Sequence, residues 1–213
     1  MPATLEKIIH VCETFGAEND MTFCDRKTNC MFFPCHRSRL PTCSTPPSVK
    51  LYGTPLPYVL SVTYLGYQIT PDLSDDDSIR NQTRQLYTKA NSLIRTFGNC
   101  SAEVKRILFV AHCSPMYCVQ LWNNHSAGVL QRLRVAYHDA FKIIMSQPRS
   151  TSNSLFFAQL GVDTFDARRR KLTHSFAARL LVSGNGIISL LLRSDAFPRS
   201  QFWRRYCQLV CRP

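Results

Sequence analysis

Glycine and acidic side chains are both scarce in this chain, and several common catalytic signatures are missing. The 213 residues include 8 glycines, none of them in a G-x-G-x-x-G or G-K-[ST] pattern, so the sequence indicates no glycine-rich phosphate loop. No G-x-S-x-G turn, which would present a nucleophilic serine, is found either. The sequence therefore predicts no self-sufficient active site of these kinds.

Long hydrophobic runs are absent as well. No apolar stretch approaches the roughly 18 residues that a membrane-spanning helix needs. Glu6, Lys7 and Glu13 lie where a signal peptide would be uncharged. We expect an intracellular chain, in the cytoplasm or nucleus and not secreted, with no membrane partner.

The ten cysteines lack the C-x2-C spacing that holds one side of a zinc ion. Four soft ligands could come from Cys24, Cys30, Cys35, His36 and Cys43, spaced C-x5-C-x4-C-H-x6-C. Because free cysteine also packs as a small hydrophobe, we favour reduced, packed thiols over a metal site. A zinc-stabilised interaction protein is kept as an alternative. Cys207 and Cys211 are likewise interpreted as packed thiols in preference to zinc ligands.

Charge is abundant but unevenly distributed. The chain has 26 basic and 14 acidic residues, a net charge of +12. Residues 1–77 hold 6 basic and 9 acidic side chains, whereas residues 78–213 hold 20 and 5. This asymmetry points to a polyanionic partner for the second part, most simply nucleic acid.

Hydrophobic periodicity predicts an α+β, mostly α fold, with small antiparallel strands followed by a helical bundle. Apolar residues at helical spacing over 5–15 predict a first helix that starts almost at Met1 and ends at Asn19-Asp20. Short apolar and β-branched runs then predict strands at 21–23, 29–33, 49–52, 56–60 and 62–69, of which 56–60 is expected to be an edge or irregular strand because Pro55 and Pro57 cannot donate to a ladder. Beyond Thr70, helical stripes occur over 79–97, 101–121 with a kink at Pro115, 130–144, 155–160, 165–181, 187–193 and 200–210.

Asp75, Asp76 and Asp77 form the most conspicuous acidic run. Paired aspartates can hold Mg²⁺ for nucleotidyl transfer when they converge from rigid strands. Here they follow a loop and precede a helical stripe, where carboxylates favour the positive end of the helix dipole. We interpret them as a helix N-terminus, and no metal site is predicted.

The basic residues of the predicted helices form a stronger pattern. Acidic residues at i±4, which would balance them on a merely solvated face, are mostly missing. A nucleic-acid-binding role is therefore assigned to Arg80, Arg84, Arg95, Lys105, Arg106, Arg132 and Lys142. The run 168–171 (Arg-Arg-Arg-Lys) and Arg134 belong to the same pattern.

Three short motifs follow one another in the first part of the chain: Phe23-x-x-x-Lys27-Thr28-x-Cys30-Met31-Phe32, Leu51-Tyr52-Gly53-x-Pro55-Leu56 and Tyr64-Leu65-Gly66-Tyr67-x-Ile69. Their order and spacing resemble the end of the palm in the reverse transcriptases of non-LTR retrotransposons. The later motifs look like the helices that follow it, namely Leu86-Tyr87-x-x-Ala90-Asn91, Cys100-Ser101-x-x-Val104-Lys105, Pro115-Met116-Tyr117-Cys118 and Val135-Ala136-Tyr137.

The resemblance implies three regions and a role for each. Residues 1–70 would be the palm end and primer-grip hairpin, 71–148 the helical thumb, and 149–213 a helical extension. Lys27 would lie near the triphosphate or pyrophosphate, and the primer grip would include Gly53, Tyr64, Leu65 and Gly66. The implied partners are RNA or an RNA–DNA hybrid, together with the missing fingers and palm portion.

One departure from the family changes the expected activity. The Tyr-x-Asp-Asp turn and the earlier aspartate, which would hold two Mg²⁺ ions in the parent enzyme, are not found in this sequence. We expect a truncated, non-catalytic RNA-directed DNA polymerase segment that needs no cofactor of its own. The alternative from the residues alone is a stand-alone basic helical nucleic-acid-binding module. Without its palm neighbours, segment 1–70 is expected to be poorly packed while the helical part is compact.

Overall fold

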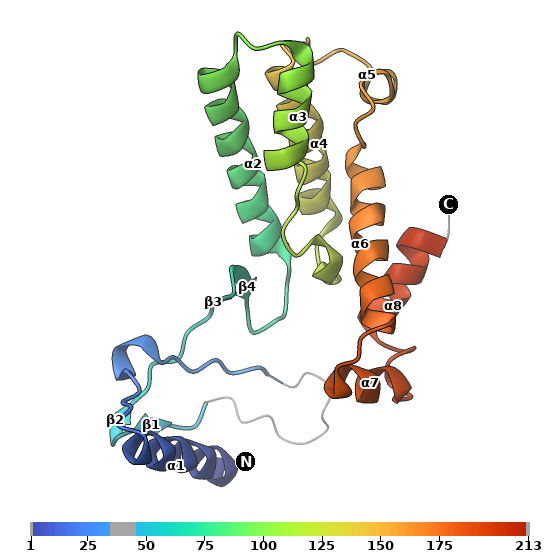
Figure 1. The fold of residues 1–213 in the computed structure, drawn as a ribbon. Coiled ribbons are helices and arrows are strands. Elements are labelled where there is room, and N and C mark those ends of the chain that lie inside the picture. Colours follow the sequence, from blue (N-terminus) through green and yellow to red (C-terminus); the bar gives the residue numbers. More distant parts are fainter. Residues whose placement is uncertain (1, 35–45, 212–213) are drawn as a thin grey trace. The chain divides into compact units, whose positions relative to one another are not determined.

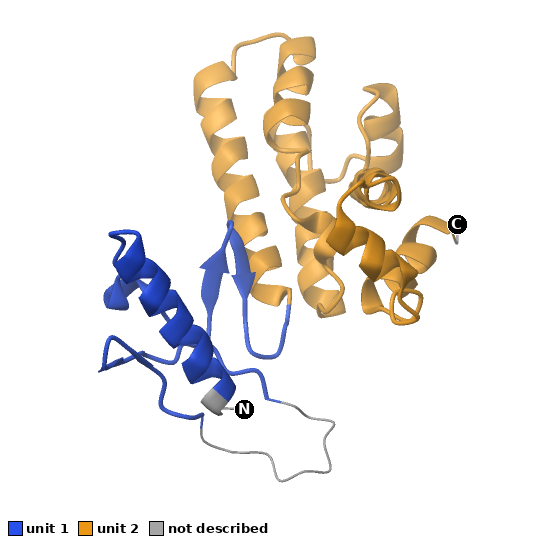
Figure 2. Ribbon diagram, turned by 60° about the horizontal axis from the view of Figure 1, so that its bottom comes forward, with its two compact units in different colours: residues 1–74 blue, residues 75–213 orange. Residues whose placement is uncertain are grey.

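The computed structural model describes residues 2–34 and 46–211, with the side chains from Thr4 onward. The described chain is mostly helical, with two small antiparallel two-stranded sheets, which confirms the α+β, mostly α fold class (Figure 1). It divides into two compact units, Met1–Ser74 (unit 1) and Asp75–Pro213 (unit 2) (Figure 2). The domain boundary expected after residue 70 lies four residues before the observed boundary between the units, after Ser74. The boundary expected after residue 148 falls inside unit 2.

Unit 1 begins with helix α1 (Pro2–Glu18), followed by the 3₁₀ turn η1 (Asp25–Lys27). Two hairpins come next: β1 (Lys50–Leu51) pairs with β2 (Thr54–Pro55), and β3 (Val62–Tyr64) pairs with β4 (Tyr67–Ile69). The core cluster of this unit consists of Val49, Leu51 and Leu56, against which Ile9, Cys30 and Tyr58 pack.

Several expected strands of unit 1 are wrong. The segments 21–23 and 29–33 do not pair with each other, and Cys30 makes only an isolated bridge to Tyr58. Run 56–60 is irregular, as expected from Pro57, which has no N–H to donate. The run 62–69 is a hairpin, because Leu65 and Gly66 take positive φ angles of 48° and 79° and reverse the chain.

Unit 2 is built from α2 (Asp76–Phe97), α3 (Ala102–His112) and α4 (Ala127–Ile144), with η2 (Val119–Leu121) before α4. The chain continues through α5 (Asn153–Gln159), α6 (Phe165–Leu181), α7 (Gly186–Arg193), α8 (Gln201–Tyr206) and the π-helical turn η3 (Cys207–Cys211). Its core is aromatic: five fully buried rings pack in edge-on and tilted pairs, from Phe109, Tyr137, Phe141, Phe157 and Phe165.

Helices α2 and α4 agree well with the hydrophobic periodicity, because each buries one apolar stripe, whereas α7 and α8 have no buried residue. Ser101 caps α3 as expected, since its Oγ accepts from the Val104 amide at 3.4 Å. The expected kink at Pro115 is wrong: α3 ends at His112, and η2 is a separate turn. A proline disfavours helical conformation in the residue before it, so ending the helix avoids that conflict.

Within residues 2–34 and 46–211, no single helix is both long enough and apolar enough to cross a bilayer. Helices α6 and α7 reach that length and apolarity only when taken together, and they are bent by 100° at their junction.

Candidate nucleic-acid interface

Helix α2 carries three exposed arginines on one face, which we call the α2 arginine stripe (Arg80, Arg84 and Arg95). Arg84 follows Arg80 by four residues and precedes Arg95 by eleven, about one and three helical turns, so all three project in similar directions. Ile79 and Leu86 are buried on the opposite side of the helix. The burial of one side of α2 thus fixes the outward direction of these guanidinium groups.

A groove between α2 and α4 lies next to the α2 arginine stripe. Thr83 and Tyr87 stand three and seven residues after Arg80, on the neighbouring part of the helix surface. Across from them α4 contributes exposed Arg132. Partial burial raises the pKa of the Tyr87 hydroxyl, to which Asp139 adds, so this phenol stays protonated near neutral pH. The hollow has a volume of about 310 Å³ and is lined by Thr83, Tyr87, Gln131, Arg132 and Val135.

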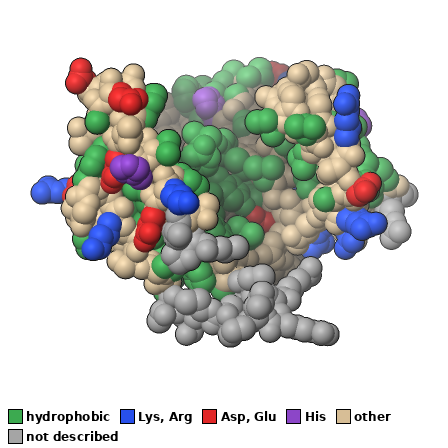
Figure 3. Space-filling model, turned by 90° about the horizontal axis from the view of Figure 1, so that it is seen from below, with side chains coloured by type: hydrophobic (Ala, Val, Ile, Leu, Met, Phe, Trp, Pro, Cys, Tyr) green, Lys and Arg blue, Asp and Glu red, His purple; other side chains and the backbone are tan. Residues whose placement is uncertain are grey.

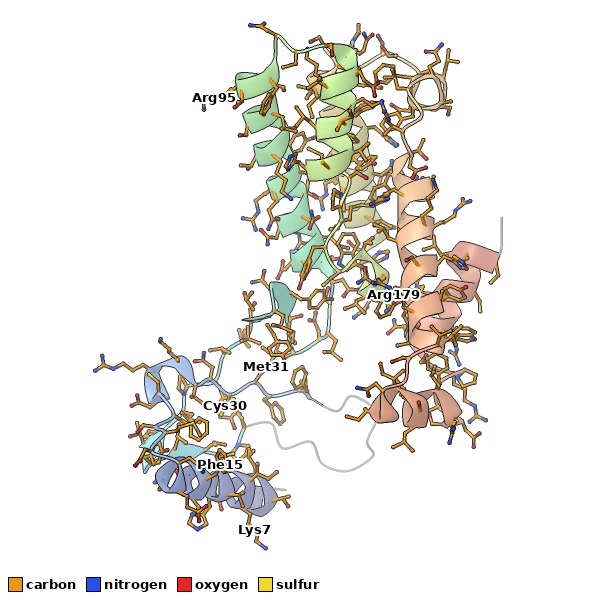
Figure 4. The ribbon with its side chains drawn as sticks, in the orientation of Figure 1. Lys7, Phe15, Cys30, Met31, Arg95 and Arg179 are labelled. Carbon is orange, nitrogen blue, oxygen red and sulfur yellow. The ribbon has the colours of Figure 1, made fainter. Side chains whose placement is uncertain are left out.

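The C-terminal end of α2 forms a second, polar surface. Arg95 projects from α2 on the side away from α3 (Figure 4). It borders an open hollow of about 620 Å³ whose other lining residues are hydroxyl and amide side chains, Thr88, Asn91, Ser92 and Thr96. Such groups donate hydrogen bonds to phosphate and sugar oxygens in nucleic-acid complexes.

Ion pairing separates the basic residues into two groups. Arg80 pairs with Asp77 at 2.6 Å and Asp76 at 3.7 Å, and Arg106 pairs with Glu103 at 2.6 Å. The expectation that acidic partners are mostly missing is therefore wrong for these two arginines. Within the described part of the chain, no ion pair involves Arg84, Arg95, Lys105 or Arg132. These four retain an uncompensated charge.

Lys142 does not belong to the interface. Its side chain is only 3 % exposed, and Nζ donates to the carbonyl oxygen of Arg149 at 2.8 Å. The sequence places a lysine on the inner side of α4, where the long aliphatic chain packs in the core and the ammonium reaches a backbone acceptor. Its assignment as a nucleic-acid contact is corrected accordingly.

Two residues of the run 168–171 make contacts within unit 2. Arg168 donates to the carbonyl of Ser114, and Lys171 pairs with Asp163 at 2.6 Å. Arg134 of α4 pairs with Asp166 of α6 at 2.8 Å. These contacts join α6 to α4 and to the chain before it, so much of this charge stabilises unit 2 itself.

The residues expected at a primer grip lie in the two turns of unit 1. Gly53 has a φ of 77° and connects β1 to β2, while Leu65 and Gly66 connect β3 to β4. Tyr64 ends β3 and is 64 % exposed. Lys27 is exposed and is the last residue of η1, outside the two hairpins. Gly53 and Gly66 supply the positive φ angles that two-residue hairpins require.

The aspartate run does not fit a magnesium site. Asp75 is the N-cap residue of α2, and its carboxylate accepts from the amides of Asn123 and Asn124, both at 2.6 Å. Asp76 accepts from the amide of Ser126 at 2.8 Å. Two of the three carboxylates thus join the starts of α2 and α4. Outside the segments 1, 35–45 and 212–213, no cluster of three His, Cys, Asp or Glu side chains could hold a metal ion.

The cysteines expected as alternative zinc ligands are only partly described. Cys24 is exposed and Cys30 is partly buried, which raises the pKa of the Cys30 thiol. Cys35, His36 and Cys43 lie outside the described residues. Cys207 and Cys211 are free thiols on η3.

Sequence reasoning missed one polar cluster. Trp122, Arg169 and Thr173 each have a buried nitrogen or oxygen atom without a hydrogen-bond partner in the described structure. Arg169 was recognisable only as part of a basic run. Its proximity to Trp122, which is 47 residues earlier, depends on how η2 packs against α6, and no local pattern reveals that.

Comparison with known proteins identifies no relative of this chain. No protein-family model, no curated protein and no solved structure matches it.

Proposed function

We propose that this chain is a non-catalytic segment of a non-LTR retrotransposon reverse transcriptase, which binds RNA or an RNA–DNA hybrid through the helices of unit 2. The family assignment depends on the order and spacing of the motifs around Lys27, Gly53 and Leu65. The binding activity depends on one structural observation, the exposed α2 arginine stripe beside a groove that Arg132 borders from α4.

The charge distribution supports this proposal. Unit 1 holds six basic and six acidic residues, whereas unit 2 holds 20 basic and 8 acidic residues, so unit 2 carries the whole net charge of +12. Arg84, Arg95 and Arg132 are exposed and make no ion pair with described residues. Exposed guanidinium groups without an ion-pair partner can neutralise phosphates. This releases the counterions condensed on the nucleic acid, and that release is the main source of affinity for a nucleic-acid backbone.

The tyrosine in the groove favours a recognition surface over a merely solvated one. Tyr87 and Val135 line the hollow together with Arg132. A partly buried aromatic ring beside an unpaired guanidinium offers sugars and bases an apolar contact, while the arginine binds the phosphate.

The test is a binding titration of the full chain against a labelled RNA–DNA hybrid, followed by fluorescence anisotropy at several salt concentrations. The wild type should lose affinity with salt at a log–log slope of about −0.9 for each phosphate contact. The triple variant R84Q/R95Q/R132Q should flatten this slope by about 0.9 for each contact that is lost.

A matched control removes the same charge elsewhere in unit 2. R179Q/R193Q/R199Q changes three exposed arginines of α6, α7 and the following segment, and should alter the slope by less than half as much. Replacement of buried Lys142 by Met should leave affinity within about twofold. Equal losses in both triple variants would mean that net charge, and not this face, governs binding. No salt-dependent binding by the wild type would overturn the proposal.

A further inference from the structure

A small hollow in unit 2 lies between η2, α6 and the C-terminal helix α8 with η3. It has a volume of about 10 Å³, and its lining residues include Trp122, Arg169, Thr173 and Arg205. That volume holds one atom of the size of a water oxygen. The hollow is separate from the groove between α2 and α4, which has a different set of lining residues.

Three of the lining residues carry buried polar atoms without a partner in the described structure. They are Trp122 Nε1, Arg169 Nε and Thr173 Oγ1, and the residues Trp122 and Thr173 are 2 % and 5 % exposed. Indole and guanidinium nitrogens can only donate hydrogen bonds, and a threonine hydroxyl can donate one. Unsatisfied buried donors are costly, so a group that accepts from all three would stabilise this region.

The local charge favours an anion over a neutral acceptor. Burial lowers the pKa of the Arg169 guanidinium, and Arg205 and Arg134 lower it further, against the opposing effect of Asp166. The carboxylate of Asp166 is bonded to Arg134, and Nη2 of Arg169 lies 3.5 Å from Nε2 of His125. The Arg169 side chain is partly buried, and a partly buried cation without a bonded carboxylate favours a counter-ion, which a water molecule does not supply.

We propose that this hollow binds one oxygen of a phosphate group, with Trp122, Arg169 and Thr173 as donors and Arg205 at the rim. One oxygen fills the volume, and the remainder of the phosphate stays outside, near the exposed Arg205 side chain. Free inorganic phosphate and a phosphodiester of a bound nucleic acid both supply such an oxygen. The site does not depend on the proposed reverse-transcriptase origin.

The test is titration of the full chain with inorganic phosphate, followed by calorimetry at constant ionic strength with chloride as the balancing anion. Thr173→Val removes one hydroxyl at nearly constant volume, and Arg205→Gln removes the charge at the rim. Each should weaken phosphate binding by about tenfold, as expected for loss of a hydrogen bond to a charged group. Arg204→Gln is the matched control, because Arg204 is the exposed neighbour of Arg205 and does not line the hollow.

Circular dichroism of each variant checks that the fold is intact, and the exposed position of Arg205 makes R205Q the variant least dependent on core packing. Equal weakening by R204Q and R205Q, or no phosphate binding by the wild type, would overturn the proposal. A second arm repeats the titration with saturating RNA–DNA hybrid. Loss of phosphate binding then identifies a backbone phosphate as the occupant, and unchanged binding identifies the free anion. Failure of hybrid binding alone would leave the phosphate site standing.

Discussion

Asp75 joins the start of α2 to the segment just before α4. It is 4 % exposed, and Oδ2 accepts from two consecutive backbone amides, those of Asn123 and Asn124. Its own amide donates to the carbonyl of Asn124 at 2.7 Å. The carboxylate thus sets the position at which α4 begins relative to α2, and with it the two walls of the groove.

Replacing Asp75 with alanine should therefore destabilise the protein. Two partly buried hydrogen bonds to backbone amides would be lost, at a cost of about 2 kcal/mol in the free energy of unfolding. The measurement is urea denaturation followed by circular dichroism. Asp77→Ala is the matched control, because Asp77 is exposed and pairs with Arg80 at the surface, where the expected cost is below about 1 kcal/mol. Equal effects of the two substitutions would contradict this role of Asp75.

His138 makes the stability of unit 2 depend on pH. Its Nε2 accepts from the amide of Phe165 at 3.4 Å, and its ring packs edge-on against Phe157 at 5.2 Å. Burial lowers the pKa of His138 from 6.5; Lys142 and Arg134 lower it further, while Asp166 and Asp139 oppose the shift. The folded state consequently binds fewer protons than the unfolded state at pH values between this lowered pKa and about 6.5.

The free energy of unfolding should accordingly fall as the pH drops from about 7.5 to 5.5. His125, whose pKa burial also lowers, acts in the same direction. His138→Gln keeps an acceptor near the Phe165 amide but cannot titrate, so it should flatten the slope. His112→Gln, an exposed position at the end of α3, serves as control. The idea fails if both variants retain the slope of the wild type in denaturant titrations at a series of pH values.

At the scale of elements, the hairpins of unit 1 depend on backbone conformation more than on packing. Tyr52 and Gly53 connect β1 to β2 with φ angles of 49° and 77°, which is the arrangement of a type I′ turn. A Cβ at Gly53 would meet nothing within 4 Å, so the cost of a substitution there comes from the positive φ and not from a clash.

Gly53→Ala should thus weaken the β1–β2 hairpin by about 1 kcal/mol. Gly184→Ala is the matched control, since a Cβ there also meets open space and the residue has no positive φ; it should be neutral or slightly stabilising. The readout is exchange of the Leu56 amide, which donates to the Val49 carbonyl at 2.8 Å at the open end of the hairpin. Unchanged protection of this amide in Gly53→Ala would show that the turn does not limit the hairpin.

The elements that could be predicted from the sequence are those with a long hydrophobic pattern. Helix α6 was predicted with its observed bounds, 165–181, and α2 to within a few residues, because several helical turns repeat the same apolar spacing. The three-residue run at 21–23 carries too little pattern to distinguish a strand from irregular chain. The candidate interface was predictable for Arg84 and Arg132, which are exposed, but not for Lys142, whose burial depends on the packing of α4.

At the scale of the whole molecule, the two units differ in how much hydrophobic surface they bury. Unit 2 buries the five aromatic rings around Tyr137. Unit 1 has a core cluster of three buried residues, while Ile8, Val11 and Phe15 of α1 are 55 %, 66 % and 52 % exposed. Hydrophobic side chains are visible among the charged ones in the space-filling view of Figure 3. Stability is therefore expected to be concentrated in unit 2.

Native-state amide exchange followed by mass spectrometry measures this difference directly. Amides of α4 should exchange only through global unfolding of unit 2, whereas amides of α1 should exchange through local opening of unit 1, at least about a hundredfold faster after correction for intrinsic rates. Repeating the experiment at low denaturant concentrations separates the two mechanisms of exchange. Exchange through local opening is nearly insensitive to denaturant, because local opening exposes little surface, whereas exchange through global unfolding becomes faster. Equal protection of α1 and α4 with the same denaturant dependence would mean that both units unfold as one. The apolar face of α1 would then need a covering surface within the chain, and no separate partner would be required to explain it.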